Sequence, residues 1–92
     1  MPVTVRVPAQ LRTLTEGSGE VHLDGSTVGE VLKALDAAHP GFGSRLFDDA
    51  GGLRRFVNVF VADEDVRFLR GLETPVSDGQ TVSIVPAVAG GS

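Results

Sequence analysis

The sequence has no cysteine, tryptophan or tyrosine, and only two of its 92 residues are histidines. A thiol nucleophile, a thiolate metal site and a disulfide framework are therefore excluded. No apolar run approaches the roughly 18 residues that a membrane span requires. The longest candidate, residues 56–62, contains Asn58. The start of the chain alternates apolar and polar residues and lacks the cationic and apolar stretches of a secretory signal. We therefore expect a cytoplasmic protein without a membrane partner.

The chain also has fewer basic residues than acidic residues. Eight Lys and Arg residues stand against twelve Asp and Glu residues, which gives a formal net charge of −4. This excess disfavours nucleic acid or an anionic membrane as the main partner, and favours a protein with a basic surface. With 41% apolar residues, the chain has enough core for one domain but not for two. We predict a domain over residues 1–86 and a flexible tail over residues 87–92.

Alternating apolar and polar residues predict strands near both ends of the chain. Residues 3–7 and 21–23 show this period of two on either side of a glycine-containing turn at residues 16–19. We therefore expect an N-terminal hairpin. Residues 82–86 repeat the alternation and predict the last strand, which ends at Pro86.

The period changes to that of a helix after Thr27. Apolar residues recur at spacings of three and four from Val28 to Ala38, which places them on one helical face. Thr27 and Glu30 have the spacing of a capping box, and Pro40 followed by glycine ends the helix. The glycines of residues 41–52 predict a loop, with one helical turn at residues 44–47 that contacts the core.

Residues 56–62 predict a strand with two different faces. Val57, Val59 and Val61 are assigned to the core, whereas Asn58 and Phe60 lie on the other face. A buried amide at Asn58 would need a hydrogen-bond partner. Residues 63–65 then form a turn, and residues 66–68 a short strand.

This order of elements predicts an α+β fold, in which one main helix covers one face of a mixed sheet of four to five strands. The other face is open. It either forms an interaction patch or is ordinary surface. The residues expected there are Thr4, Arg6, Asn58, Phe60, Ser83 and Val85.

The internal residues predict no catalytic or metal site and no bound cofactor. His22 and His39 are seventeen positions apart without a further ligand at a suitable spacing. The acidic residues 63–65 lack the register of a calcium loop and are interpreted as a solvated turn that also contacts a basic partner. Gly51 and Gly52 precede a strand instead of a helix, so they do not form a phosphate-binding loop.

The carboxyl terminus is the remaining candidate for a chemical role. Gly90 and Gly91 lie four and five residue steps beyond Pro86, and residues without a Cβ fit a narrow tunnel. An enzyme can activate such a carboxylate as an acyl-adenylate. The same composition is equally typical of an inert, flexible end or of a cloning scar.

Joined to the order of elements, the ending Pro-Ala-Val-Ala-Gly-Gly at residues 86–91 resembles the ubiquitin-like (β-grasp) sulfur carriers of the MoaD, ThiS and CysO group. The resemblance covers essentially the whole chain. Residues 55–58, 63–68, 71–72 and 78–79 resemble the CysO type most, as does the extra loop at residues 41–52.

The resemblance implies a sulfur carrier that is a protein cosubstrate and not an enzyme. Gly91 would be adenylated by an ATP-dependent, E1-like enzyme, converted to a thiocarboxylate, and used by a sulfur-accepting synthase. For the CysO type this acceptor is a pyridoxal-phosphate cysteine synthase, and a zinc metalloprotease then releases the product. Gly90 keeps the tail thin. Docking of the partners is expected at Phe60, Val85, Arg6 and Val88.

Several alternatives stay open at this stage. Ser92 places Gly91 in an amide bond, so it is a residue to be trimmed by the protease, a cloning residue, or a block. The sulfur could instead go to molybdopterin, the thiazole of thiamine or a thiosugar. A ubiquitin-like modifier attached to lysines and a non-covalent interaction module are further candidate functions.

Overall fold

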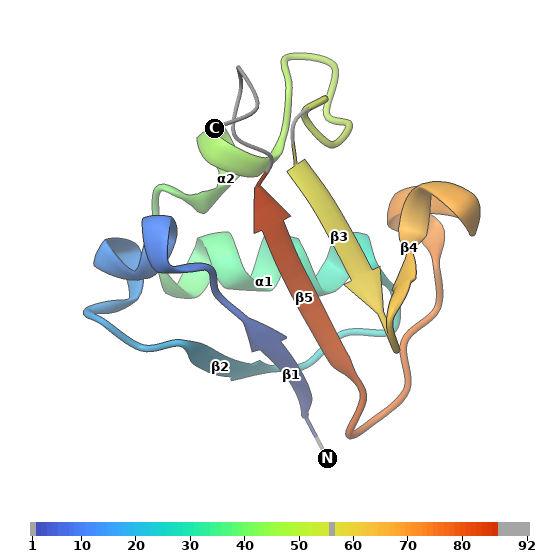
Figure 1. The fold of residues 1–92 in the computed structure, drawn as a ribbon, viewed down its shortest axis with the longest axis horizontal. Coiled ribbons are helices and arrows are strands. Elements are labelled where there is room, and N and C mark those ends of the chain that lie inside the picture. Colours follow the sequence, from blue (N-terminus) through green and yellow to red (C-terminus); the bar gives the residue numbers. More distant parts are fainter. Residues whose placement is uncertain (1, 56, 87–92) are drawn as a thin grey trace.

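The computed structural model describes residues 2–55 and 57–86, which form one mixed sheet of five strands with helices packed against it (Figure 1). Its α+β architecture agrees with the prediction. The strands are β1 (Val3–Arg6), β2 (Glu20–Leu23), β3 (Val57–Val61), β4 (Glu64–Asp65) and β5 (Thr81–Pro86). The helices are α1 (Val28–Ala38) and α2 (Phe42–Leu46), with the 3-10 segments η1 (Ala9–Thr15), η2 (Val66–Phe68) and η3 (Gly71–Glu73).

The sheet has the strand order β2-β1-β5-β3-β4, so the last strand lies in its centre. β1 and β2 form the predicted antiparallel hairpin, β5 runs parallel to β1, and β3 is antiparallel to β5. The carboxyl ends of β1 and β5 and the start of β3 therefore lie at the same end of the sheet. This arrangement brings residues from three distant parts of the sequence around Pro86, where β5 ends.

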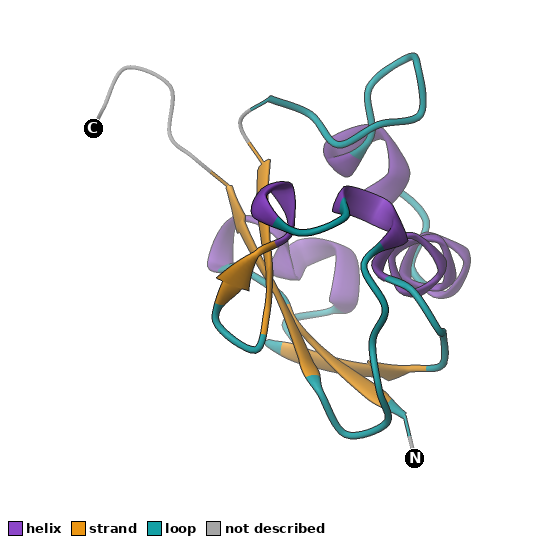
Figure 2. Ribbon diagram, turned by 90° about the vertical axis from the view of Figure 1, so that its right-hand side faces the viewer, coloured by secondary structure: helices purple, strands orange, loops and turns teal. Residues whose placement is uncertain are grey.

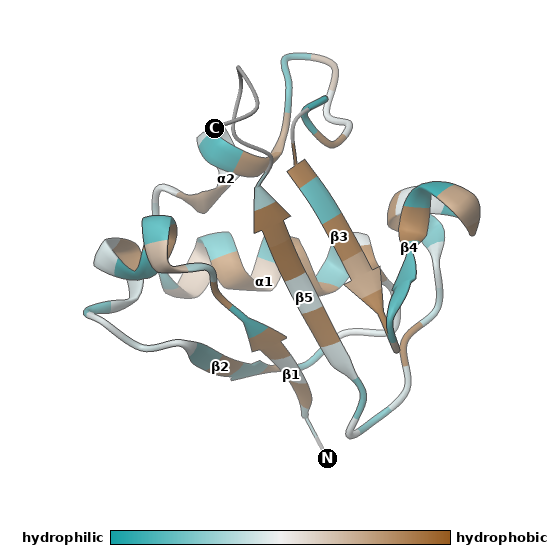
Figure 3. Cartoon of the chain, in the orientation of Figure 1, coloured by the Kyte–Doolittle hydropathy of each residue, from teal (hydrophilic) through white to brown (hydrophobic). Residues whose placement is uncertain are grey.

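Helix α1 covers one face of the sheet, and the two form separate layers (Figure 2). The central strands β1, β3 and β5 are mainly hydrophobic, whereas the edge strand β4 is hydrophilic (Figure 3). Alternate residues of the central strands point toward α1, as the period of two predicts. The buried apolar residues are Val3, Val5, Val7, Leu11, Val28, Val31, Leu32, Leu35, Phe42, Leu46, Val57, Val59, Val61, Val66, Val76, Val82 and Ile84.

The start of α1 is capped as predicted, with one difference. Thr27 Oγ1 accepts a hydrogen bond from Glu30 N at 3.2 Å. The Glu30 carboxylate accepts from Ser26 N at 2.8 Å, one residue before the backbone N–H that a capping box normally uses. The chain around Thr27 is also paired with a distant segment, because Val28 N donates to Thr74 O at 2.9 Å. Tertiary pairing therefore fixes this helix start together with the local cap.

The second helix begins earlier than the predicted turn at residues 44–47. Gly41 has a φ of 115°, a left-handed conformation that glycine adopts at little cost. It reverses the chain directly after α1, so that α2 starts at Phe42. Phe42 and Leu46 are fully buried, whereas Phe47 is half-buried at the edge of the core. The sequence pattern predicted core contacts through Leu46 and Phe47, which the structure confirms, but it missed Phe42.

The predicted strand at residues 66–68 is wrong, because these residues form the 3-10 segment η2. The Asp65 carboxylate accepts a hydrogen bond from Arg67 N at 2.9 Å and caps this turn. With three residues per turn, residues two apart point in different directions. Val66 is accordingly buried, whereas the Phe68 side chain is 87% exposed.

Within residues 2–55 and 57–86, no helix has the length and hydropathy that crossing a membrane requires. The predicted tail, residues 87–92, lies outside the described residues. The predicted domain boundary at residue 86 coincides with the end of β5, and the independence of the domain from the tail stays a prediction.

Candidate functional site

The predicted site has two parts, a C-terminal tail and a docking face. Gly90, Gly91 and Val88 lie outside the described residues. The docking face is described, and its position follows from the register of the central strands.

Arg6, Phe60 and Val85 lie on the sheet face opposite α1. Arg6 and Phe60 both pair with Ser83, one from each side, so these three residues form a row across β1, β5 and β3. Asn58 pairs with Val85 in a second row closer to the end of β5. Val85 is 45% exposed and Phe60 is only half-buried. The structure therefore brings the described members of the predicted docking face together, and their docking role stays a prediction.

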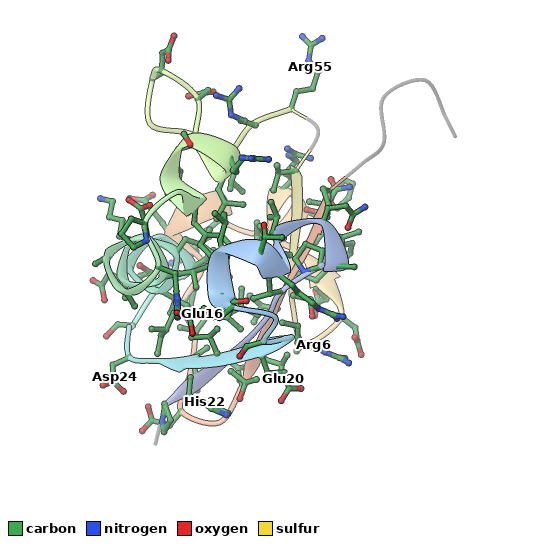
Figure 4. The ribbon with its side chains drawn as sticks, turned by 90° about the vertical axis from the view of Figure 1, so that its left-hand side faces the viewer. Arg6, Glu16, Glu20, His22, Asp24 and Arg55 are labelled. Carbon is green, nitrogen blue, oxygen red and sulfur yellow. The ribbon has the colours of Figure 1, made fainter. Side chains whose placement is uncertain are left out.

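An open cleft of about 610 Å³ lies beside this end of β5. Arg6 and Glu20 are opposite each other on β1 and β2 and contribute to it (Figure 4). Arg12 reaches it from η1. Its lining consists of Arg6, Val7, Pro8, Arg12, Gly19, Glu20, Ser83, Ile84 and Val85.

The Arg12 side chain is held by backbone contacts. Its Nε donates a hydrogen bond to Val7 O at 3.1 Å. Its guanidinium also lies against Gly19, where an added Cβ would be 3.2 Å from the guanidinium carbon. Gly19 therefore leaves the space that the guanidinium occupies at the cleft.

Arg67 is a site residue that the sequence did not identify. Its guanidinium donates to Asn58 Oδ1 at 2.6 Å, to Arg54 O at 2.7 Å and to Arg55 O at 3.2 Å. These contacts attach η2 to the start of β3, next to the end of β5. The one signal in the sequence was the amide of Asn58 in an otherwise apolar strand. It predicted a hydrogen-bond partner but did not identify Arg67 as that partner.

The structure also places two other sequence candidates, His22 and the acidic turn at residues 63–65. His22 Nδ1 lies 3.2 Å from Thr4 Oγ1 on the open face. In the described part of the chain, no three His, Cys, Asp or Glu side chains are grouped so that they could hold a metal ion. The acidic turn has a structural role, because Glu64 and Asp65 form β4 and Asp65 caps η2.

Known proteins match the chain over most of its length. The model of the ThiS family matches residues 5–91. The sulfur carrier protein CysO of Mycobacterium tuberculosis is 50% identical over 93 residues, which cover 99% of this chain and 100% of that protein. The small archaeal modifier protein 3 of Haloferax volcanii is 43% identical over 68 residues, with a coverage of 74% of this chain and 73% of that protein.

Solved structures show the same similarity. A chain in the crystal structure of the BexX/CysO complex of Amycolatopsis orientalis is 49% identical and superposes with a TM-score of 0.91, covering 97% of this chain and 99% of that one. CysO of Mycobacterium tuberculosis superposes with a TM-score of 0.88 at 48% identity, covering 94% of this chain and 99% of that one. The predicted β-grasp fold and the resemblance to the CysO type are thereby confirmed. The chain belongs to the ThiS family.

Proposed function

We propose that this protein is a sulfur carrier, whose C-terminal Gly91 bears the transferred sulfur as a thiocarboxylate. The full-length similarity to the sulfur carrier protein CysO, at 50% identity, is the observation that carries this proposal. The Gly90-Gly91 ending supports it, and the family match extends as far as residue 91. The described residues offer a binding face instead of a catalytic centre, as a protein cosubstrate requires.

The chemistry takes place at one carboxyl group. The Gly91 carboxylate attacks the α-phosphorus of ATP in a partner enzyme of the E1-like kind, which forms an acyl-adenylate and releases pyrophosphate. A sulfide sulfur then attacks the acyl carbon, and AMP leaves. One oxygen of the carboxylate is thereby replaced by sulfur. The carrier itself contributes no acid, base or metal to either step.

The fold serves this chemistry by presenting the tail. Five residue steps separate Pro86 from Gly91, and at about 3.3 Å per residue an extended tail spans roughly 16 Å. The partner docks on the open face at Arg6, Phe60 and Val85, with Val88 of the tail adding to the contact. This arrangement keeps the folded domain outside the partner's tunnel while the glycines enter it.

The similarity to CysO favours cysteine biosynthesis as the destination of the sulfur. The acceptor enzyme is then a pyridoxal-phosphate synthase that uses an activated serine, and a zinc metalloprotease releases the product. The same kind of protease removes Ser92, since Gly91 has no free carboxylate while it is bonded to Ser92. All of these partners act in the cytoplasm.

A second candidate function is attachment to other proteins. The 43% identity to the small archaeal modifier protein 3 favours it. The same activated Gly91 would then be attacked by a lysine amine, with an isopeptide bond as the product. Lysine-linked adducts in cell extract distinguish this outcome from sulfur transfer.

The test uses two forms of the protein, the full chain and a chain that ends at Gly91. Each is incubated with the activating enzyme, ATP and a sulfide source, and its intact mass is measured. We expect the mass change of one oxygen-to-sulfur replacement only on the form that ends at Gly91. A thiocarboxylate on Ser92, or no thiocarboxylate on the shorter form, would contradict the proposal.

A further inference from the structure

Charged residues are unevenly distributed between the two ends of the sheet. Five arginines gather at the end of the sheet where β5 ends. Arg6 lies near the carboxyl end of β1, and Arg12 lines the cleft beside Val85. Arg54 and Arg55 lie in the loop before β3, whose first residue, Val57, pairs with Pro86. Arg67 joins them through its hydrogen bonds to both carbonyls. We call Arg6, Arg12, Arg54, Arg55 and Arg67 the basic collar.

Four of the twelve acidic residues lie at the opposite end of the sheet. Asp63 and Glu64 lie in the turn from β3 to β4, which is beside the early part of β5 because Val61 pairs with Val82. Asp78 lies in the turn that leads into β5, and Asp24 follows β2 where it pairs with the start of β1. The net charge of −4 is therefore spread unevenly over the two ends, although Glu20 faces Arg6 and Asp48 and Asp49 stand in the loop before Arg54.

The guanidinium groups of the basic collar are available to a partner. All five arginines are exposed. The guanidinium hydrogen bonds of Arg12, Arg54 and Arg67 go to uncharged oxygens, so these bonds leave their charges unneutralised. Arg6 and Arg55 form no side-chain hydrogen bond or ion pair with another described residue. Figure 4 shows Arg55 projecting from the loop before β3 and Arg6 on the open-face side. Glu20 is the one acidic residue among those lining the cleft.

We propose that the basic collar docks on an acidic rim, namely a ring of Asp and Glu side chains around the tunnel of the activating enzyme that receives the tail. This inference rests on the proposed function, because the tail must enter a partner for the collar to meet its rim. It replaces the expectation of a basic partner, which followed from the net charge alone. Arginines outnumber the acidic residues around the docking end, and the charges at the docking end decide orientation.

Such an arrangement mainly changes the rate at which the carrier and its partner associate. Single exposed ion pairs contribute little to affinity, but several like charges on one face orient a partner and accelerate association. The effect depends on salt, since the screening length is about 10 Å at 0.1 M ionic strength. The collar would therefore aim the tail at the tunnel before the open face makes its short-range contacts.

The test reverses the charges of the two collar arginines whose side chains form no hydrogen bond or ion pair with a described residue. Arg6→Glu, Arg55→Glu and the double variant are compared with Arg70→Glu, an exposed arginine outside the collar. All are made in the chain that ends at Gly91, and circular dichroism confirms folding. The rate of thiocarboxylate formation by the activating enzyme is measured against carrier concentration at low and high salt.

We expect the double variant to raise KM about tenfold at low salt, within the range of electrostatic steering, with kcat nearly unchanged. Arg70→Glu should change KM less than twofold, and high salt should remove most of the difference. The inference would be overturned if Arg70→Glu raised KM as much as the collar variants, or if the double variant left KM unchanged. In both cases the proposed function stands as long as the wild type forms a thiocarboxylate. Collar-dependent binding to duplex DNA with an unchanged KM would also overturn it. Failure of the wild type to form a thiocarboxylate would instead contradict the proposed function.

Discussion

The guanidinium of Arg67 donates a hydrogen bond of 2.6 Å to Oδ1 of Asn58. This bond joins the η2 segment to the start of strand β3, which follows the loop at residues 54–55. The same side chain donates to the carbonyl oxygens of Arg54 and Arg55. One residue therefore fixes the position of the segment that borders the end of β5. The polar side chain in the middle of an apolar strand is explained by this contact.

Replacement of Arg67 tests this role. Arg67→Ala removes three side-chain hydrogen bonds, and because the group is exposed we expect a loss of about 1–2 kcal/mol in the free energy of unfolding. Arg67→Lys should recover only part of this loss, since an ammonium group does not reproduce the planar fork of a guanidinium. Urea denaturation measures both, and Arg70→Ala is the matched control with an expected change under about 0.5 kcal/mol. Equal stability of Arg67→Ala and Arg70→Ala would show that the contacts contribute nothing.

The 3-10 conformation of η2 predicts opposite consequences for two neighbouring apolar residues. Val66 is fully buried, so Val66→Ala should lower the free energy of unfolding by about 1.5–3 kcal/mol. Phe68 is 87% exposed, and Phe68→Ala should change it by less than about 0.5 kcal/mol. Chemical denaturation of the two variants measures the difference. Comparable losses would mean that both side chains face the core, as in the strand that the alternation predicted.

The turn between β3 and β4 contains a strained residue. Ala62 and Asp63 have φ values of 51° and 69°, which are left-handed conformations. Ala62→Gly should therefore stabilise the protein by about 0.5–1 kcal/mol, because glycine adopts this conformation without a steric cost. Ala37→Gly in the exposed part of α1 is the control, with an expected loss of about 1 kcal/mol. The melting temperature should rise for Ala62→Gly and fall for Ala37→Gly. A lower melting temperature for both variants would refute the strain at Ala62.

Removal of the tail separates stability from function. Among the described residues, the buried core lies within residues 3–84. We expect residues 87–92 to add no core contact, so a chain that ends at Pro86 should keep its free energy of unfolding within about 0.5 kcal/mol. The same chain should form no thiocarboxylate, because it lacks Gly91. Denaturation and intact mass measure the two properties on one sample. A large loss of stability would show that residues 87–92 pack on the domain.

The periodicity of the sequence predicted most elements of the fold. The period of two identified β1, β2, β3 and β5, and the period near 3.6 identified α1, because burial of one face imposes these patterns on the chain itself. The short segments were less predictable. Phe42 became a core residue because Gly41 reverses the chain directly after α1, and residues 66–68 form a 3-10 turn because Asp65 caps them.

The sequence by itself determined the chemistry that is left to this protein. A chain without cysteine carries no thiol, so the sulfur that we propose it carries needs another attachment point, and the Gly90-Gly91 pair is the one that we propose. Only the tertiary structure decided what surrounds the end of β5. Net charge is a sum over residues, but the field at a surface depends on position. The parallel pairing of β1 with β5 and the antiparallel pairing of β3 with β5 bring Arg6 and Arg55 to the same end of the sheet, although they are far apart in the sequence.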